Sequence, residues 1–289
     1  MDPARAALPA LTRDPRPAAL VGRHAALELV FEPRGGRTVL SHAYAEPPYH
    51  IGAGYAVGRG VALTIVCAGA GIFPGDGWRQ SVRVASGAQV VLSSQSALQA
   101  RGGAAAAATL RQEYDVEPDG ELHCLWDPLI PFAGARLSQE IDIRLCGGAR
   151  LFWSDALMSG RVARSESWMF ASLSHELRLT IGETLIYLER YALDHGGARA
   201  LQPWSAGPSP FLGTALVSHP EVTLAGVDRL QDDLGAIAGV HAGVDLPDTR
   251  LAVARIAGRS GATFKAARAL IRRWATSTLF RDAGLEIRR

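Results

Sequence analysis

Short runs of apolar, β-branched or alternating residues recur between positions 25 and 193, and these runs predict β-strands. They lie at residues 27–31, 62–66, 80–84, 89–92, 136–145, 176–181 and 184–190. In residues 139–145, isoleucine and leucine alternate with Glu, Asp and Arg, so that one face is apolar and the other charged. We therefore expect strands with one packed face and one solvated face, separated by Gly, Pro and Asp turns.

The order of the strands favours a stacked architecture. Residues 80–84 alternate in polarity, and Gly87-Ala88 then turns the chain into an apolar run, which is typical of a corner between two strands. Long helical patterns do not separate the strands, so an antiparallel or stacked β fold is favoured over a doubly wound α/β fold. Strand, glycine turn and strand recur without a fixed repeat length. We expect a mainly β protein with a stacked or coiled, β-helix-like sheet.

Helical periodicity is concentrated in the C-terminal third. Residues 196–210 are rich in Gly, Pro and Ser and indicate a crossing loop or an internal boundary. After it, apolar residues recur at helical spacing in residues 228–237 and 261–280. We expect a flexible Pro/Ala/Arg-rich leader at 1–20 and a single domain at 21–289. In that domain the β body covers about 25–225 and a helical part about 226–282.

Composition excludes several classes of protein. The 289 residues are 48% hydrophobic and only 20% charged, with a net charge of +2, so the chain can bury a large core but lacks the basic excess of nucleic-acid-binding proteins. The longest apolar run, at 61–73, is shorter than the roughly 20 residues of a membrane helix. An early acid and several prolines replace the apolar stretch of a signal peptide. We expect a cytoplasmic protein that binds neither nucleic acid nor membrane.

The usual catalytic motifs are also missing from the sequence. It has no P-loop, no GxSxG elbow and no HExxH pair, and the glycines at 52–58 lack dinucleotide-binding spacing. The three cysteines, at 67, 124 and 146, are too far apart for a CxxC zinc site. The eight histidines form no HxH or HxxxH pair. Neither a nucleophile nor a tight metal cage is indicated.

Four acids in strand-and-turn segments are the candidate functional residues. They are Asp76, Asp127, Asp155 and Glu166. Asp76 also fits a structural turn, and Glu166 fits an ion pair with Arg161 or Arg164. Alternatively, acids along an interior path would bind a divalent cation weakly enough to let it move on, because hard oxygen ligands hold borderline ions loosely. The residues alone leave both interpretations open.

Several segments, taken in order, resemble the urease accessory protein family UreD, also called UreH. They are Gly71-Ile-Phe-Pro-Gly-Asp76 with the corner at 86–88, Val91-Leu-Ser-Ser-Gln95-Ser-Ala, Trp126-Asp-Pro-Leu-Ile-Pro-Phe-Ala-Gly-Ala-Arg136, and Met158-Ser-Gly-Arg-Val-Ala-Arg-Ser-Glu166 with Tyr187-Leu-Glu-Arg190. The resemblance covers about residues 25–280. The chain departs from the family pattern at Pro74, Gln99 and Ser165 and in its ending.

The resemblance implies a non-enzymatic chaperone for metallocentre assembly. Such a protein would bind the urease apoprotein and, with UreF and the GTPase UreG reached through UreF, assist nickel insertion. It would hold no tight cofactor, only nickel in transit. The acids implied for an interior nickel path are Asp76 and Glu166, with Asp127 and Asp155 as additions and Gln95 and Arg161 shaping its walls.

Two other functions stay open at this point. One is a β scaffold that has lost the urease partnership, and the other is a hydrolytic enzyme in which Asp76 and Glu166 converge as an acid pair. The C-terminal helices are a candidate partner-facing surface, although their apolar stripes would equally serve to pack on the β body.

Overall fold

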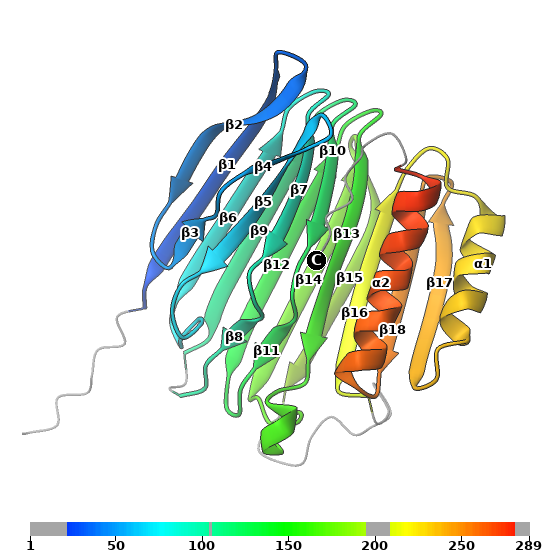
Figure 1. Cartoon of the computed structure of the whole chain (residues 1–289). Helices are drawn as coiled ribbons and strands as arrows, with labels where there is room; N and C mark the ends of the chain where they lie inside the picture. Colours follow the sequence, from blue (N-terminus) through cyan, green and yellow to red (C-terminus); the bar gives the residue numbers. More distant parts are fainter. Residues whose placement is uncertain (1–21, 104–105, 195–208, 281–289) are drawn as a thin grey trace, which may run out of the picture.

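The computed structural model describes residues 22–103, 106–194 and 209–280. In them, two β-sheets face each other, and two helices cover the outer side of the second sheet (Figure 1). The expected mainly β, stacked architecture with a helical pair is confirmed. The expected leader at 1–20 and most of the crossing loop at 196–210 lie outside the described residues.

The first sheet, sheet A, has seven strands in the order β15-β14-β12-β9-β6-β1-β2. Its strands are β1 (His24–Arg34), β2 (Arg37–Ala45), β6 (Gly77–Val84), β9 (Ala108–Val116), β12 (Arg136–Leu145), β14 (Ser172–Ile181) and β15 (Thr184–Asp194). The five from β1 to β14 pair in parallel, and an antiparallel hairpin closes each edge.

The second sheet, sheet B, has eleven strands, eight of them in the order β17-β18-β16-β13-β10-β7-β5-β3. Its strands are β3 (Tyr49–Ile51), β4 (Tyr55–Val57), β5 (Gly60–Cys67), β7 (Gln89–Ser94), β8 (Leu98–Ala100), β10 (Glu121–Leu125), β11 (Leu129–Pro131), β13 (Arg150–Met158), β16 (Phe211–Ser218), β17 (Val240–Asp248) and β18 (Leu251–Gly258).

The chain builds both sheets together by alternating between them. It passes from β6 in sheet A to β7 in sheet B, then from β9 to β10 and from β12 to β13, so that successive coils stack. Parallel neighbours need a crossover connection, and here a strand of the opposite sheet provides it. The predicted corner at 87–88 is the first of these crossings, and Gly87 has a φ of 70°, which favours glycine.

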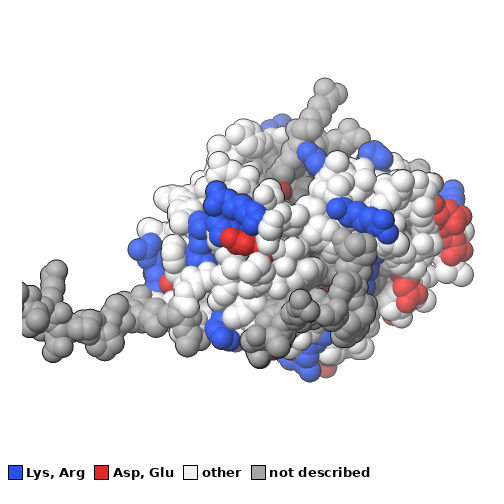
Figure 2. All heavy atoms as spheres, turned by 90° about the horizontal axis from the view of Figure 1, so that it is seen from below, with Lys and Arg blue, Asp and Glu red and all other residues white. Residues whose placement is uncertain are grey.

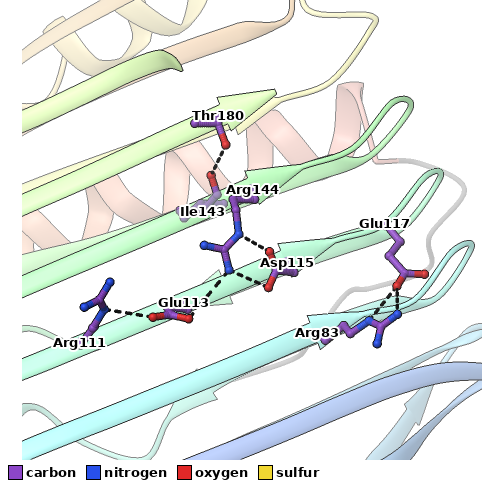
Figure 3. Close-up of polar contacts among 8 residues, drawn as sticks. All are labelled: Arg83, Arg111, Glu113, Asp115, Glu117, Ile143, Arg144 and Thr180. Carbon is purple, nitrogen blue, oxygen red and sulfur yellow. Dashed lines mark hydrogen bonds and ion pairs between the residues drawn. The ribbon is translucent and has the colours of Figure 1, made fainter. Parts of the chain in front are cut away.

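Alternating side chains explain both faces of sheet A. In β12, Ile141, Ile143 and Leu145 are buried between the sheets, as the sequence predicts, while Arg144 points outward. On that outer face, arginines and acids of adjacent strands form ion pairs, among them Arg144–Asp115 and Arg83–Glu117 (Figure 3). Each exposed pair contributes little to stability, but together they keep a broad flat sheet solvated.

The two predicted helices form as α1 (Leu224–Gly235) and α2 (Gly261–Thr278), and a short 3-10 turn, η1, spans Val162–Arg164. Thr223 and Ser260 cap the two helices through their side-chain oxygens. The helical part expected at about 226–282 also contains a hairpin that was not expected, β17–β18, which lies between the helices and extends sheet B.

The apolar faces of both helices pack on sheet B. Leu230 and Leu234 of α1 and Phe264 and Ile271 of α2 are buried in one cluster with sheet residues such as Phe152. The stripes therefore serve the fold, and the helices do not offer them to a partner. Within the described residues, no helix combines the length and apolar character needed to cross a membrane.

Candidate functional site

A cavity of about 440 Å³ lies between the two sheets. Four of the six tryptophans line it: Trp78, Trp126, Trp153 and Trp168. Trp78 and Trp126 have buried indole N–H groups without a hydrogen-bond partner among the described residues. Since buried donors are normally satisfied by protein or by ordered water, we expect the cavity to be hydrated.

One wall of the cavity is a chain of side-chain hydrogen bonds across sheet A. Gln80 and Gln112 both donate through Nε2 to the hydroxyl of Tyr114, at 2.8 and 3.0 Å. Gln139 donates to Gln112 Oε1 at 3.0 Å, and His175 Nδ1 lies 3.1 Å from Gln139 Oε1. These residues come from β6, β9, β12 and β14, so one continuous polar line crosses four adjacent strands.

Three carboxylates also line the cavity: Asp127, Asp155 and Glu189. Asp155 lies on β13 two residues from buried Trp153, and strand alternation therefore turns it inward. Burial raises its pKa above the ordinary value, and the nearby His175 opposes this shift. Glu189 accepts hydrogen bonds from the hydroxyls of Tyr187 and Thr214, both at 3.0 Å.

Of the six predicted site residues, the structure places only Asp127 and Asp155 at the cavity. Asp76 is 7% exposed, and its two carboxylate oxygens accept the backbone N–H groups of Arg23 and Phe73, at 2.8 and 3.0 Å. This geometry supports the turn interpretation of Asp76. Its role in a metal path stays a prediction.

Glu166 and Arg161 form a bidentate ion pair near the η1 turn, and the Nε–Oε2 distance is 2.7 Å. The hydrogen bond from Arg161 lowers the pKa of Glu166. The Arg161 guanidinium also lies over the Phe132 ring, 4.3 Å from its centroid. The expected pairing with Arg161 is confirmed. Gln95 is exposed in the turn after β7 and does not line the cavity.

Three of the recognised segments meet at one end of the molecule. We call this surface the motif end and define it by the loops 68–76, 99–103, 131–135 and 159–171. Backbone hydrogen bonds join neighbouring loops, for example Ile72 N to Gln99 O at 2.8 Å and Phe132 N to Ala100 O at 2.9 Å. The loops thus continue the coil-on-coil stacking beyond the strands.

Glycines allow these loops to approach closely. A Cβ at Gly71 would lie 2.1 Å from Gln99 O, and one at Gly160 would lie 2.0 Å from Glu166 O. Such distances are impossible for any residue with a side chain unless the backbone moves. The acids were predicted from the sequence, but the close approaches at these glycines were not. The interior glutamines were not predicted either, although Gln80 lies on the same face of β6 as the buried Val82 and Val84.

Comparisons with known proteins agree with the segment resemblance. A family model described as UreD urease accessory protein matches residues 23–287. A urease accessory protein UreD of Sorangium cellulosum is 35% identical over 71% of this chain and 64% of its own length. UreD 2 of Streptomyces griseus is 30% identical over 76% of this chain and 78% of its own, and the Klebsiella pneumoniae UreD is 29% identical over 80% and 82%.

Proposed function

The chain belongs to the UreD urease accessory protein family, and we propose on that premise that it binds apo-urease and assists nickel insertion in the cytoplasm. The observation that carries the proposal is the family match over nearly the whole described chain. UreF and, through it, the GTPase UreG would complete the assembly. The lack of a phosphate-binding loop in this sequence fits a division of labour in which another protein hydrolyses GTP.

We further propose that nickel passes through the cavity between the sheets. His175 offers an imidazole nitrogen, which suits a borderline divalent cation, and Asp127, Asp155 and Glu189 offer carboxylate oxygens, which hold such an ion loosely. Among the described residues, no three His, Cys, Asp or Glu side chains gather closely enough to hold a metal ion. An ion would therefore move between one or two ligands at a time while keeping part of its hydration.

The role of Glu166 and Arg161 in this path stays a prediction that the cavity does not support. The pair lies at the motif end, outside the cavity lining. Nickel that reached Glu166 would have to compete with the Arg161 guanidinium for the same carboxylate. The enzyme alternative gains no support from the geometry, because backbone N–H groups and Arg161 already engage the carboxylates of Asp76 and Glu166.

The direct test is urease nickel content in cells that carry the cognate urease operon with this chain intact or deleted. We expect deletion to leave urease subunits that assemble but contain little nickel and show little activity. Full nickel and full activity after deletion would reject the proposed function. Restoring the chain from a plasmid controls for effects on neighbouring genes.

Asp76→Ala separates a structural role from a role in the path. The change removes the acceptor of two backbone N–H groups, so we expect it to lower the free energy of unfolding by about 1–3 kcal/mol. Urea denaturation of the purified variant measures this loss. If the variant instead keeps wild-type stability but fails to support nickel insertion, Asp76 belongs to the path and the turn interpretation is insufficient.

A further inference from the structure

The motif end exposes large apolar side chains in a basic setting. Phe73 is 47% exposed and Met169 is 54% exposed. They lie on the first and the last of the four stacked loops, so at a spacing of about 4.8 Å per coil they are separated by roughly 15 Å. The two loops between them carry Arg101 and Phe132.

Arginine dominates the charge of this surface. The four loops contain Arg101, Arg161 and Arg164 against two carboxylates, of which Asp76 is buried and Glu166 is paired. Figure 2 looks at this end of the molecule, where Lys and Arg side chains gather around few acidic atoms. The outer face of sheet A differs, because its arginines pair with acids of adjacent strands.

Two of these guanidinium groups are held in fixed positions. Arg101 and Arg161 both lie over the Phe132 ring, 4.4 and 4.3 Å from its centroid. Arg101 also donates to Ala70 O and, at 2.8 Å, to Gln99 Oε1. Side chains that are already ordered lose little entropy on binding, and Arg and aromatic residues are the ones that most often dominate binding energy.

The cavity approaches the same end. Trp168, which precedes the exposed Met169, lines the cavity, as do Leu98 and Leu129 of the strands that lead into the motif-end loops. Trp168 has a φ of 59°, a left-handed conformation that is uncommon for a bulky residue. A cargo in the cavity would therefore lie close to whatever is bound at the motif end.

We infer that the motif end is the surface that docks on apo-urease, against a urease patch that places carboxylates around an apolar contact. This inference rests on the proposed function for the identity of the partner. Charge complementarity to Arg101 and Arg164, in addition to the Arg161–Glu166 pair, sets the acidic character of that patch, and Phe73 and Met169 set its apolar character. The position of the cavity favours the recipient of the cargo at this surface over other members of the assembly.

The test compares matched variants of the full chain. Met169→Glu and Arg164→Glu change exposed residues of the motif end, and Leu224→Glu and Arg229→Glu make the same changes at exposed positions of α1. Binding of each purified variant to apo-urease is measured by biolayer interferometry, after thermal denaturation has verified folding. We expect the two motif-end variants to bind about tenfold more weakly or worse, and the two α1 variants to bind as the wild type. Met169→Leu should retain binding.

Several outcomes would overturn the inference. Wild-type binding by both motif-end variants, or weaker binding by the α1 variants instead, would place the urease contact elsewhere. Loss of binding to UreF with unchanged binding to apo-urease would assign the surface to another partner. The proposed function fails separately, if the wild-type chain does not bind apo-urease and its deletion leaves urease fully loaded with nickel.

Discussion

Replacing Glu121 with alanine is expected to lower the free energy of unfolding by about 3–5 kcal/mol. Glu121 begins β10, and its side chain is 1% exposed. One carboxylate oxygen lies 3.0 Å from His123 Nε2, and the other lies 3.0 Å from the guanidinium of Arg150. Without the carboxylate, the half-buried Arg150 keeps a positive charge that has lost this partner, and the buried His123 loses its polar partner.

The same cluster holds the end of α2 against sheet B. Phe280 follows the helix and packs edge-on against His123, with ring centroids 4.5 Å apart, and against His219 at 5.1 Å. Burial lowers the pKa of His219, and the nearby Arg150 adds to this effect. Losing Glu121 would therefore loosen the docking of α2 as well as the strand pairing beneath it.

Glu117→Ala is the matched control for this prediction. Glu117 also pairs with an arginine, Arg83, and this pair lies at the surface, where the hydrogen bond lowers the pKa of Glu117 (Figure 3). Water compensates for the loss of an exposed ion pair, so the control should lose several-fold less stability than Glu121→Ala. Urea denaturation of both variants measures the difference. Equal losses would show that burial does not govern the contribution of Glu121.

Much of the fold follows from the alternation of side chains. All seven runs read from the sequence fall within strands, and the corner at 87–88 connects two sheets. The hairpin β17–β18 was missed because β17 contains Gly243 and Pro247, both unfavourable in strands, and lies at the sheet edge. Its partner β18 is short and apolar, a pattern that does not distinguish a strand from a buried helix segment.

The site was less predictable because it depends on register between distant strands. The inward direction of Asp155 follows from its position two residues after Trp153, on the same face of β13. Its proximity to His175 of β14 could not be predicted in this way, because it depends on which strands face each other across the core. The contacts of Asp76 and Glu166 arise in loops, where no periodicity applies. Residue type identified these acids as candidates, and only the geometry separated the cavity acids from those of the motif end.

Asp155→Asn is expected to reduce nickel delivery while leaving the fold at least as stable as the wild type. Burial raises the pKa of Asp155, so the native state binds a proton more tightly than the unfolded chain does. Wild-type stability therefore falls as pH rises through the raised pKa, and above it a desolvated charge is retained. Asparagine carries no charge, so the stability advantage of the variant should be largest at alkaline pH and shrink on acidification.

Nickel delivery by the Asp155→Asn variant should fall, although its stability should stay the same or rise. An amide oxygen attracts a divalent cation less than a carboxylate does, and a loss of about 1.4 kcal/mol of interaction corresponds to tenfold weaker binding. We therefore expect roughly tenfold less nickel in urease at limiting nickel supply, measured by atomic absorption, together with an unchanged or higher melting temperature at pH 8. Glu140→Gln, on the exposed outer face of sheet A, controls for removing a carboxylate. Full nickel loading with Asp155→Asn would exclude Asp155 from the path, because nickel delivery would then not need its carboxylate.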